Sequence, residues 1–310
     1  MYLAYSSPGR VYLSGEHAVV YGKPALVTAI NLRLTVTVEE GKKETKTSFI
    51  QIIKVVQQYL TSKKITHSDK SIHLSVKSNI PVGRGLGSSA ALSVAAAAAL
   101  LEFYTGKENS SEEINNCAYR IEKLFHLHPS GVDVSASCFG GLIYYRKEFE
   151  FLKNISRLNL KIPKNISDKL ILIDTGHPIE STGQMVEMVG TRYNKETSRV
   201  EKLLNQIEKN VKQLVVSLMK EDVAFFKKTI SENQKALVDL GVVSKKAVGI
   251  LKYLEKLGVG KITGGGGLKK GSGFILFYAE DLEGLKNHLE ISKIPYIPFS
   301  PTLEGCKKEL

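Results

Sequence analysis

The sequence predicts an α+β protein of two domains, with strands and helices mixed in each. Apolar residues alternate in some segments, as in strands, and recur every three or four residues in others, as in helices. The chain has 310 residues, of which 43% are hydrophobic, and this suits two domains or one large one. The polar stretch 154–167 is the softest boundary along the chain, and we place the division between residues 1–160 and 161–310 there.

The first part of the chain alternates between strand and helix patterns. Residues 2–38 are rich in β-branched and alternating residues, which predicts strands, and the apolar positions of "FIQIIKVVQQYL" share one helical face. "SIHLSVKSNIPVG" predicts a strand that ends in a Pro/Gly turn. Residues 90–104 then form a helix that Gly106 ends. "NSSEEINNCAYRIEKLF" begins with serine caps and early glutamates, as a further helix does.

The second part repeats this mixture. "HPSGVD" ends the preceding helix, and "FGGLIYYR" and "KLILIDTG" predict strands. Residues 181–257 contain several helical segments with charged faces. "ITGGGGLKKGSGFILFYAED" predicts a glycine loop followed by a strand, and "IPYIPFSPTLEG" predicts a strand that prolines interrupt.

Charge and cysteine content limit the possible classes of function. The net charge of +12 favours anionic partners such as nucleotides or acidic metabolites. We expect no nucleic-acid partner, because no arginine-rich helix or basic strip with interleaved aromatic residues occurs. The three cysteines lack CxxC spacing, which argues against a disulfide scaffold or a structural zinc site. The apolar run 90–101 is too short for a membrane span, so we expect no membrane partner and a cytoplasmic protein.

The stretch "PVGRGLGSSA" is the main candidate for a phosphate site. Its glycines allow positive φ and a close approach of a ligand to the backbone, and its serines begin a helix whose free N–H groups attract anions. A turn with a serine cap is the simpler alternative. No lysine follows the last glycine, so the loop is not a Walker A loop, and its glycine spacing differs from the dinucleotide fingerprint. The predicted phosphate-binding residues are Pro81, Gly83, Arg84, Gly85, Leu86, Gly87, Ser88, Ser89 and Ala90.

Glu122 faces the apolar side of a predicted helix. It lies four residues after Ala118, on the same face as Ile114 and Ile121. A carboxylate that faces a core needs a partner or a bound cation. Glu122 is therefore either a metal ligand or a boundary residue that pairs with a lysine.

Four motifs occur in a fixed order: "SSPGRVYLSGEHAVVYGKPAL", "PVGRGLGSSAAL", "HPSGVD" and "KITGGGG". Together they resemble the GHMP kinases, and "GEHAVVYG" with "HPSGVD" is most similar to the mevalonate kinases. The resemblance runs from Pro8 to the final "PTLEG". It implies ATP-dependent phosphorylation of mevalonate to 5-phosphomevalonate in isoprenoid biosynthesis. It also implies a first domain with a mixed sheet and a left-handed βαβ crossover, a ferredoxin-like second domain, and an active site in the cleft between them.

The resemblance assigns the catalytic and metal-binding roles. Asp133 would accept the proton of the substrate hydroxyl, and Glu122, eleven positions earlier, would bind Mg²⁺ together with Ser89. Arg10 stands where the family usually has a lysine. Its charge can still lower the pKa of Asp133, but a planar guanidinium has a different geometry from an ammonium group.

The resemblance also implies substrate contacts. Glu16 and His17 would face the substrate. Thr182 follows a serine that predicts a helix cap, and a threonine lies near the substrate in relatives. Arg192, further along the same helix, could bind a carboxylate or lie on the surface. "KITGGGG" would buttress the phosphate loop from the other domain.

Two further interpretations stay open at this stage. One is another GHMP kinase, such as a phosphomevalonate kinase or a mevalonate 3-kinase. A second phosphate would need an additional cationic pocket, for which His126, His128, Arg192, Lys269 and Lys270 are candidates. The other is an ATP-binding sensor without catalysis, although the presence of both a base and metal ligands argues against it. The expected partners are ATP, Mg²⁺ and a mevalonate-like alcohol, and a homodimer is one possible assembly.

Overall fold

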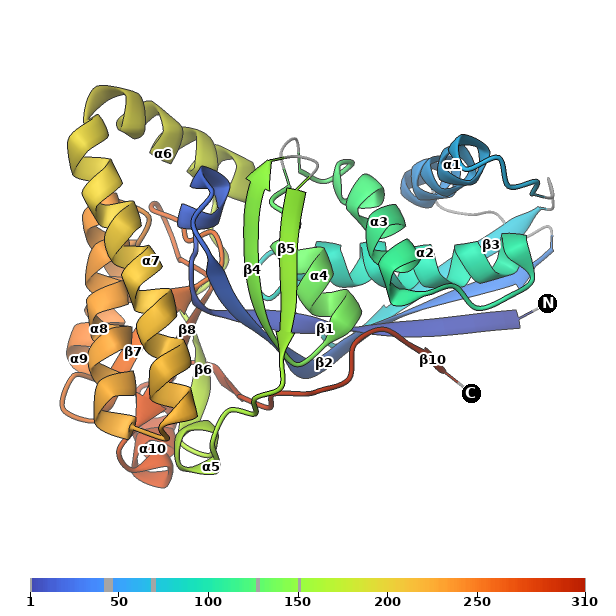
Figure 1. The fold of residues 1–310 in the computed structure, drawn as a ribbon. Helices are drawn as coiled ribbons and strands as arrows, with labels where there is room; N and C mark the ends of the chain where they lie inside the picture. The colour runs from blue at the N-terminus through green and yellow to red at the C-terminus, as the bar shows by residue number, and fades with distance from the viewer. Residues whose placement is uncertain (1, 42–46, 68–70, 127–128, 150–151, 310) are drawn as a thin grey trace.

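The computed structural model describes residues 2–41, 47–67, 71–126, 129–149 and 152–309. Figure 1 shows two sheets with helices packed around them. The strands are β1 Tyr2–Ser14, β2 Ala25–Glu40, β3 Ile72–Ser78, β4 Leu142–Phe149, β5 Leu152–Leu158, β6 Leu170–Asp174, β7 Gly258–Thr263, β8 Phe274–Ala279, β9 Tyr296–Pro298 and β10 Lys307–Glu309. The helices are η1 Ala18–Tyr21, α1 Thr47–Ser62, α2 Ser88–Thr105, α3 Ser111–Glu122, α4 Val132–Phe139, α5 Lys164–Ser167, α6 Thr182–Lys195, α7 Thr197–Met219, α8 Val223–Leu240, α9 Lys245–Tyr253 and α10 Leu282–Ile291.

The first sheet has the strand order β10-β1-β2-β4-β5, and β3 also pairs with β2. β2 is long enough to carry two partners end to end: residues 25–28 pair with β4, and residues 34–40 pair with β3. All ladders between the described strands of this sheet are antiparallel. The predicted mixed sheet is therefore wrong in this detail, because β3 and β4 lie along different parts of β2 and not side by side. The handedness of the crossover stays a prediction.

α2 is the central helix of the first half. It packs with α4 directly on β1 and β2, while α1 and α3 lie outside it (Figure 1). Its alanines, from Ala95 to Ala99, are all buried, and their small side chains allow the helix to approach the sheet closely. By length and composition α2 could cross a membrane, but most of it is buried inside the protein, as in the core helix of a globular domain.

The second sheet has the order β7-β8-β6-β9, and its ladders are also antiparallel. Along the chain, β6 is followed by helices, then β7, β8, α10 and β9, which is the β-α-β-β-α-β order of the predicted ferredoxin-like domain. α8 and α9 pack on β7, and α7 packs on α8 and reaches β1 (Figure 1). The two halves therefore share a buried junction.

The chain passes from the first sheet to the second between β5 and β6, within the boundary region expected from the sequence. β5 begins before this region and extends into it, so residues 154–158 of the expected boundary are strand and not linker. The last residues depart from the predicted range of the second domain. β10 pairs with β1, so that Ala4 lies opposite Glu309, and Ile30 bridges to Pro301. The end of the described chain thus belongs to the first sheet.

Candidate active site

The glycines of the predicted phosphate loop have positive φ, with values of 68° at Gly83, 77° at Gly85 and 81° at Gly87. A Cβ atom on Gly85 would lie 2.8 Å from the carbonyl oxygen of Thr263, and one on Gly264 would lie 2.9 Å from the Cα of Gly85. A larger residue would not fit at this crossing. The "KITGGGG" stretch therefore packs against the loop from the second half of the protein, in the position expected of a buttress.

The amino terminus of α2 lies at the end of this loop. Gly87 precedes the helix, and no side chain caps its first turn. The serine-cap alternative is therefore wrong, and the first N–H groups of the helix can bind an anion. Leu86 and Ala90 are fully buried. They anchor the loop and the helix in the core, so their contribution to a phosphate site comes from the backbone.

The side chain of Arg84 has a different role from the predicted one. It forms an ion pair with Asp174 at the end of β6. Pro81 and Arg84 line a separate pocket of about 440 Å³. The guanidinium thus ties the loop to the second sheet, and phosphate binding by this side chain is not supported.

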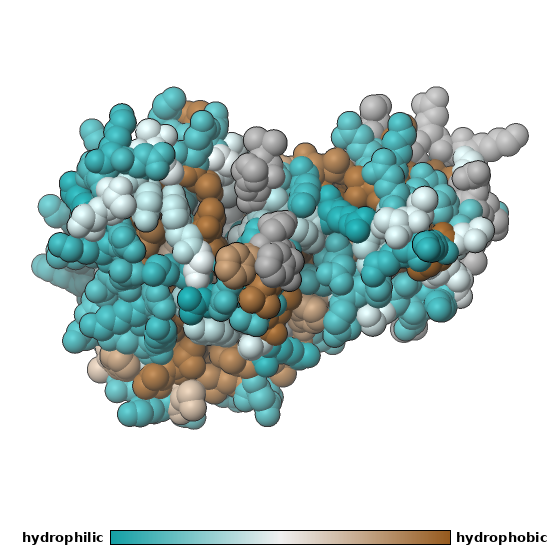
Figure 2. Space-filling model, turned by 45° about the horizontal axis from the view of Figure 1, so that its top comes forward, coloured by the Kyte–Doolittle hydropathy of each residue, from teal (hydrophilic) through white to brown (hydrophobic). Residues whose placement is uncertain are grey.

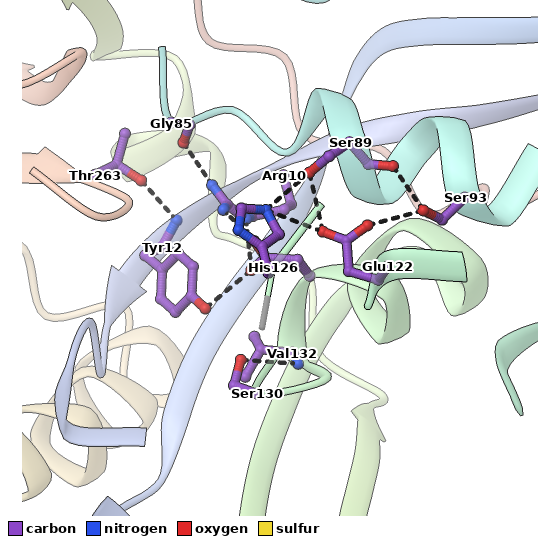
Figure 3. A network of polar contacts seen from close by, with 11 residues as sticks. Arg10, Tyr12, Gly85, Ser89, Ser93, Glu122, His126, Ser130, Val132 and Thr263 are labelled. Atoms are coloured by element: carbon purple, nitrogen blue, oxygen red, sulfur yellow. Dashed lines mark hydrogen bonds and ion pairs between the residues drawn. The ribbon is translucent and has the colours of Figure 1, made fainter. Parts of the chain in front are cut away.

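Arg10 and Tyr12 are buried beside the loop (Figure 3), and they form a polar network with Asp133, whose side chain is 26% exposed. Arg10 Nε donates a hydrogen bond to Asp133 Oδ1 at 2.9 Å, and Arg10 Nη2 donates to Oδ2. The third nitrogen, Nη1, donates to the carbonyl oxygen of Gly85. The hydroxyl of Tyr12 donates to Asp133 Oδ1 at 2.9 Å. Arg10 therefore links the candidate base to the phosphate loop.

The network keeps Asp133 charged. Burial acts to raise the pKa of Asp133, but the charge and hydrogen bonds of Arg10 and the hydrogen bond of Tyr12 outweigh it, so that the pKa lies below its usual value. Asp133 also lies in the first turn of α4, where the helix dipole favours a negative charge. The carboxylate is thus ionised at neutral pH and can accept a proton.

Glu122 lies at the end of α3 and is 2% exposed. Ser89 Oγ donates to its Oε1 atom at 2.9 Å, and Ser93 Oγ donates to Oε2 at 2.8 Å (Figure 3). His126 Nε2 lies 3.4 Å from Oε1. The sequence thus correctly paired Ser89 with Glu122, and the alternative of a lysine partner is wrong.

The Glu122 cluster fits a hard cation. Burial raises the pKa of Glu122, and His126 and the two serines only partly oppose this. An ionised carboxylate here would gain from a cation, and carboxylate and hydroxyl oxygens are ligands that Mg²⁺ prefers. Within the described ranges, no three His, Cys, Asp or Glu residues form a metal cluster. A metal would therefore need further ligands from phosphate or water, as is common for Mg²⁺.

Glu16 and His17 are buried and contribute two unpaired acceptor atoms. Lys261 Nζ donates to Glu16 Oε1, while Glu16 Oε2 has no partner in the part of the chain that the structure describes. His17 Nε2 lies 3.0 Å from the carbonyl oxygen of Gly265, and Nδ1 is likewise without a described partner. Burial lowers the pKa of His17 to about 4, so the ring is neutral at pH 7. Because the carbonyl only accepts, Nε2 carries the proton and Nδ1 is an acceptor.

The two residues predicted on α6 have different positions. Ser181 caps the helix in a capping box with Gln184. Thr182 lies beside Gly265, because a Cβ atom built on Gly265 would be 3.1 Å from Thr182 Oγ1. Arg192 is near the other end of α6 and donates to the carbonyl oxygen of Asp239 at 2.8 Å, at the end of α8. The predicted substrate contact of Arg192 is therefore wrong, because the length of α6 carries it away from the site.

Several of these residues line one cavity of about 640 Å³ together with others from both halves of the protein, while the phosphate loop lies beside it and reaches it through Arg10. Its polar wall includes Arg10, Glu16, His17, Glu122, His126, Asp133 and Thr182, and its apolar wall includes Val19, Val20, Phe125, Pro129, Val134 and Val186. Figure 2 shows a mostly hydrophilic face with hydrophobic side chains gathered between the two lobes. Among the described lining residues, Arg10 is the only lysine or arginine.

Four residues of the site were not predicted: Tyr12, Ser93, Lys261 and Thr263. Ser93 could have been found, because it lies one helical turn after Ser89 on the face toward Glu122. The other three are in strands, where the local sequence contains no signal for their partners. His128, a candidate for an additional cationic pocket, lies outside the described residues.

Comparisons with known proteins agree with the motifs. Residues 48–141 match the family described as GHMP kinases N terminal domain. A mevalonate kinase from Pyrococcus horikoshii is 36% identical in an alignment of 174 positions, and the match covers 47% of this chain and 52% of that protein. A mevalonate kinase from Thermococcus gammatolerans is 34% identical in an alignment of 171 positions, and the match covers 46% of this chain and 51% of that protein. The chain thus spans about half the length of the curated relatives it matches. The resemblance to the GHMP kinases is confirmed.

Solved structures confirm the fold over nearly the whole chain. A Lin0012 protein from Listeria innocua has a TM-score of 0.80 at 22% identity, covering 100% of this chain and 99% of that one. L. major mevalonate kinase in complex with R-mevalonate has a TM-score of 0.74 at 21% identity, covering 96% and 95%. Lactococcus lactis galactokinase complexed with galactose also has a TM-score of 0.74, at 15% identity, covering 99% and 95%.

Proposed function

We propose that this chain, whose motifs and fold are those of the GHMP kinases, transfers a phosphoryl group from ATP to mevalonate and forms 5-phosphomevalonate. One observation carries the proposal: Arg10, the ionised Asp133 and Glu122 line one cavity, and hydrogen bonds join Arg10 to the Gly85 carbonyl of the glycine loop and Glu122 to Ser89 in the first turn of α2. The curated relatives named mevalonate kinases support the choice of mevalonate. The proposal includes a cytoplasmic location and no nucleic-acid or membrane partner.

The residues divide the work of phosphoryl transfer. The first N–H groups of α2 and the backbone of residues 83–87 hold the phosphates of ATP. Ser89 and Glu122 would hold Mg²⁺, which supplies positive charge to the phosphate oxygens when bound. Asp133 accepts the proton of the attacking hydroxyl, and Arg10 orients Asp133 against the loop. This transfer requires mainly positioning and charge neutralisation.

The lining of the cavity favours an acceptor without a phosphate group of its own. Lys269 and Lys270 are exposed and do not line the cavity, and Arg192 is engaged at the end of α8. His126 contacts Glu122. Of the described residues suggested for a second phosphate, Arg192, Lys269 and Lys270 do not line the cavity, and His126 already contacts Glu122, which argues against phosphomevalonate as the acceptor.

A neutral sugar is the second candidate. Glu16 Oε2 and His17 Nδ1 are both acceptors, so each needs a hydrogen-bond donor such as a hydroxyl group. A galactose molecule has more hydroxyl groups than mevalonate, and a galactokinase shares the fold. The apolar wall favours mevalonate, because its methyl and methylene groups can cover apolar surface that a sugar would leave in contact with water.

The first experiment is a coupled ADP-release assay with Mg²⁺-ATP and a panel of mevalonate, 5-phosphomevalonate, homoserine and galactose. We expect turnover with mevalonate, and phosphorus NMR of the product should place the phosphate on the 5-hydroxyl. Turnover only with galactose or only with 5-phosphomevalonate would replace the proposed substrate. A product phosphorylated at the 3-hydroxyl would make the protein a mevalonate 3-kinase. No turnover, with ATP still bound, would favour the sensor interpretation.

Arg10→Lys is expected to lower kcat about 10- to 100-fold. A lysine keeps the charge, but it cannot contact both oxygens of Asp133 and also reach the Gly85 carbonyl. The estimate follows from the roughly 1.5–3 kcal/mol that a hydrogen bond to a charged group contributes. The measurement is kcat for Arg10→Lys beside Arg157→Lys, a matched control whose guanidinium contacts only a surface carbonyl in the described structure. An unchanged kcat would show that charge alone is sufficient.

A further inference from the structure

Lys261 is a charged residue in an unusual position. It lies in β7, and its side chain is 0% exposed. Its ammonium group donates to Glu16 Oε1, to the carbonyl oxygen of Ile262 at 2.7 Å and to that of Tyr12 at 3.3 Å. The three donors of the group thus have three acceptors, two of which belong to the first half of the protein.

We propose that Lys261 is a positioning residue of the phosphoacceptor site, which holds Glu16 and Tyr12 in the orientation that the acceptor alcohol and Asp133 require. The inference rests on the proposed function, because it concerns the binding of the alcohol. Lys261 does not line the cavity, so it acts through these two neighbours.

The first neighbour is Glu16. Lys261 engages one carboxylate oxygen, which fixes the plane of the group and leaves Oε2 without a described partner. Glu16 lines the cavity, and its buried Oε2 atom lacks a described donor, which a hydroxyl group of the alcohol would supply on binding. The positive charge also favours the ionised carboxylate over the protonated form, against the effect of burial. An ionised oxygen is the stronger acceptor.

The second neighbour is Tyr12. Residues 261 and 263 lie on the same face of β7, because side chains alternate along a strand. Lys261 binds the carbonyl oxygen of Tyr12, and Thr263 Oγ1 accepts from the N–H group of Tyr12 at 2.8 Å. β7 therefore binds both backbone polar groups of the β1 residue whose hydroxyl contacts Asp133.

Stability alone is a weak reason for this ion pair. Removing an ammonium and a carboxylate group from water is costly, and a well-packed apolar pair is often as stable or more stable. Burial lowers the pKa of Lys261 and raises that of Glu16, which shows that both charges are disfavoured except through each other. A positioning role gives this costly pair a reason that stability alone does not.

The test is the Lys261→Met variant of the full chain, with Lys256→Met, an exposed lysine before β7, as the matched control. We expect kcat/KM for the alcohol to fall about 10- to 100-fold, mainly through a higher KM, while KM for ATP changes less than about twofold. Wild-type values for the alcohol would overturn the proposal. An equal loss for ATP and the alcohol would also overturn it, because that is the result of a purely structural role.

A second variant keeps the test decisive if Lys261→Met folds poorly. Lys261→Met/Glu16→Gln removes both charges and should restore folding. We expect its kcat/KM for the alcohol to be no lower than that of Glu16→Gln alone, since Lys261 acts partly through Glu16. If the loss of kcat/KM in the double variant equals the product of the losses in the two single variants, the two residues do not act together and the proposal is overturned.

A readout without turnover separates this inference from the proposed function. Carboxyl ¹³C NMR should show a higher pKa for Glu16 in Lys261→Met than in the wild type, and an unchanged pKa would overturn the positioning role. If the wild type phosphorylates none of the alcohols in the panel, the proposed function fails, and the NMR titration alone then decides whether Lys261 controls Glu16.

Discussion

Asp133→Asn is expected to lower kcat about 10²- to 10⁴-fold, the usual contribution of a general base. The substitution keeps the size of the side chain and removes the charge that accepts the proton. ATP should bind with unchanged affinity, because its proposed contacts are the first turn of α2 and the Ser89–Glu122 pair. The effect should be specific to catalysis.

The measurement combines steady-state kinetics with calorimetric titration of ATP. Asp168→Asn is the matched control, since Asp168 is exposed at the end of α5. A variant that retains more than about a tenth of the wild-type kcat would exclude Asp133 as the base.

The pH dependence gives an independent check on the same residue. Asp133 has a lowered pKa, so its stabilising effect is present above the unfolded-state pKa and is lost as the pH falls through the folded-state pKa. Protonation of Asp133 should therefore not limit kcat until the pH is below the ordinary pKa of aspartate, about 3.9. In Arg10→Met this limit should move to higher pH, because the cation that lowers the pKa is absent.

Glu122→Gln is expected to lower kcat at least about 100-fold and, at the same time, to stabilise the apoprotein at neutral pH. The loss of rate follows from the loss of a charged metal ligand next to the transferred phosphate. The gain in stability follows from the raised pKa of Glu122. The folded state holds this proton over a pH range in which the unfolded state has lost it, so stability falls as the pH rises through that range. A neutral glutamine removes this loss.

Thermal unfolding between pH 4 and pH 8, with and without Mg²⁺-ATP, tests the second half of this prediction. Above the normal glutamate pKa, the unfolding temperature should fall less steeply with pH in Glu122→Gln than in the wild type. Mg²⁺-ATP should also stabilise the variant less than the wild type. Glu187→Gln is the control, because Glu187 lines the same cavity but is exposed. Equal slopes in the wild type and Glu122→Gln would contradict the assigned cause.

Local pattern was sufficient for most elements of the fold. The alternation before Pro81 and the capped helix starts are properties of short segments, and the structure has the expected elements there. α4 was missed because the eight residues after Gly131, most of which are small, have no clear helical stripe. The antiparallel first sheet was missed for a different reason. It depends on the length of β2, and pairing along two parts of one strand is a tertiary property.

The residues of the site likewise separate into those that the sequence indicates and those that only tertiary contacts bring together. Helix periodicity placed Glu122 toward the core, and the family resemblance singled out Ser89 and Asp133, which lie in the first turns of α2 and α4. Lys261 and Tyr12 come from strands of different sheets, and only the folded chain brings them together. The predicted substrate contact of Arg192 was wrong because the sequence indicated only where α6 starts. The role of a residue at the far end of the helix depends on what that end contacts.

The pairing of β10 with β1 has a consequence for synthesis on the ribosome. Ala4 emerges before its partner Glu309, which follows about 300 positions later. At roughly 5–20 residues per second, the outer edge of β1 waits at least about 15 seconds for that partner. During this interval β1 presents an unpaired strand edge next to a partly formed sheet. Nascent chains stalled before residue 307 should therefore be more prone to association than chains that have released β10.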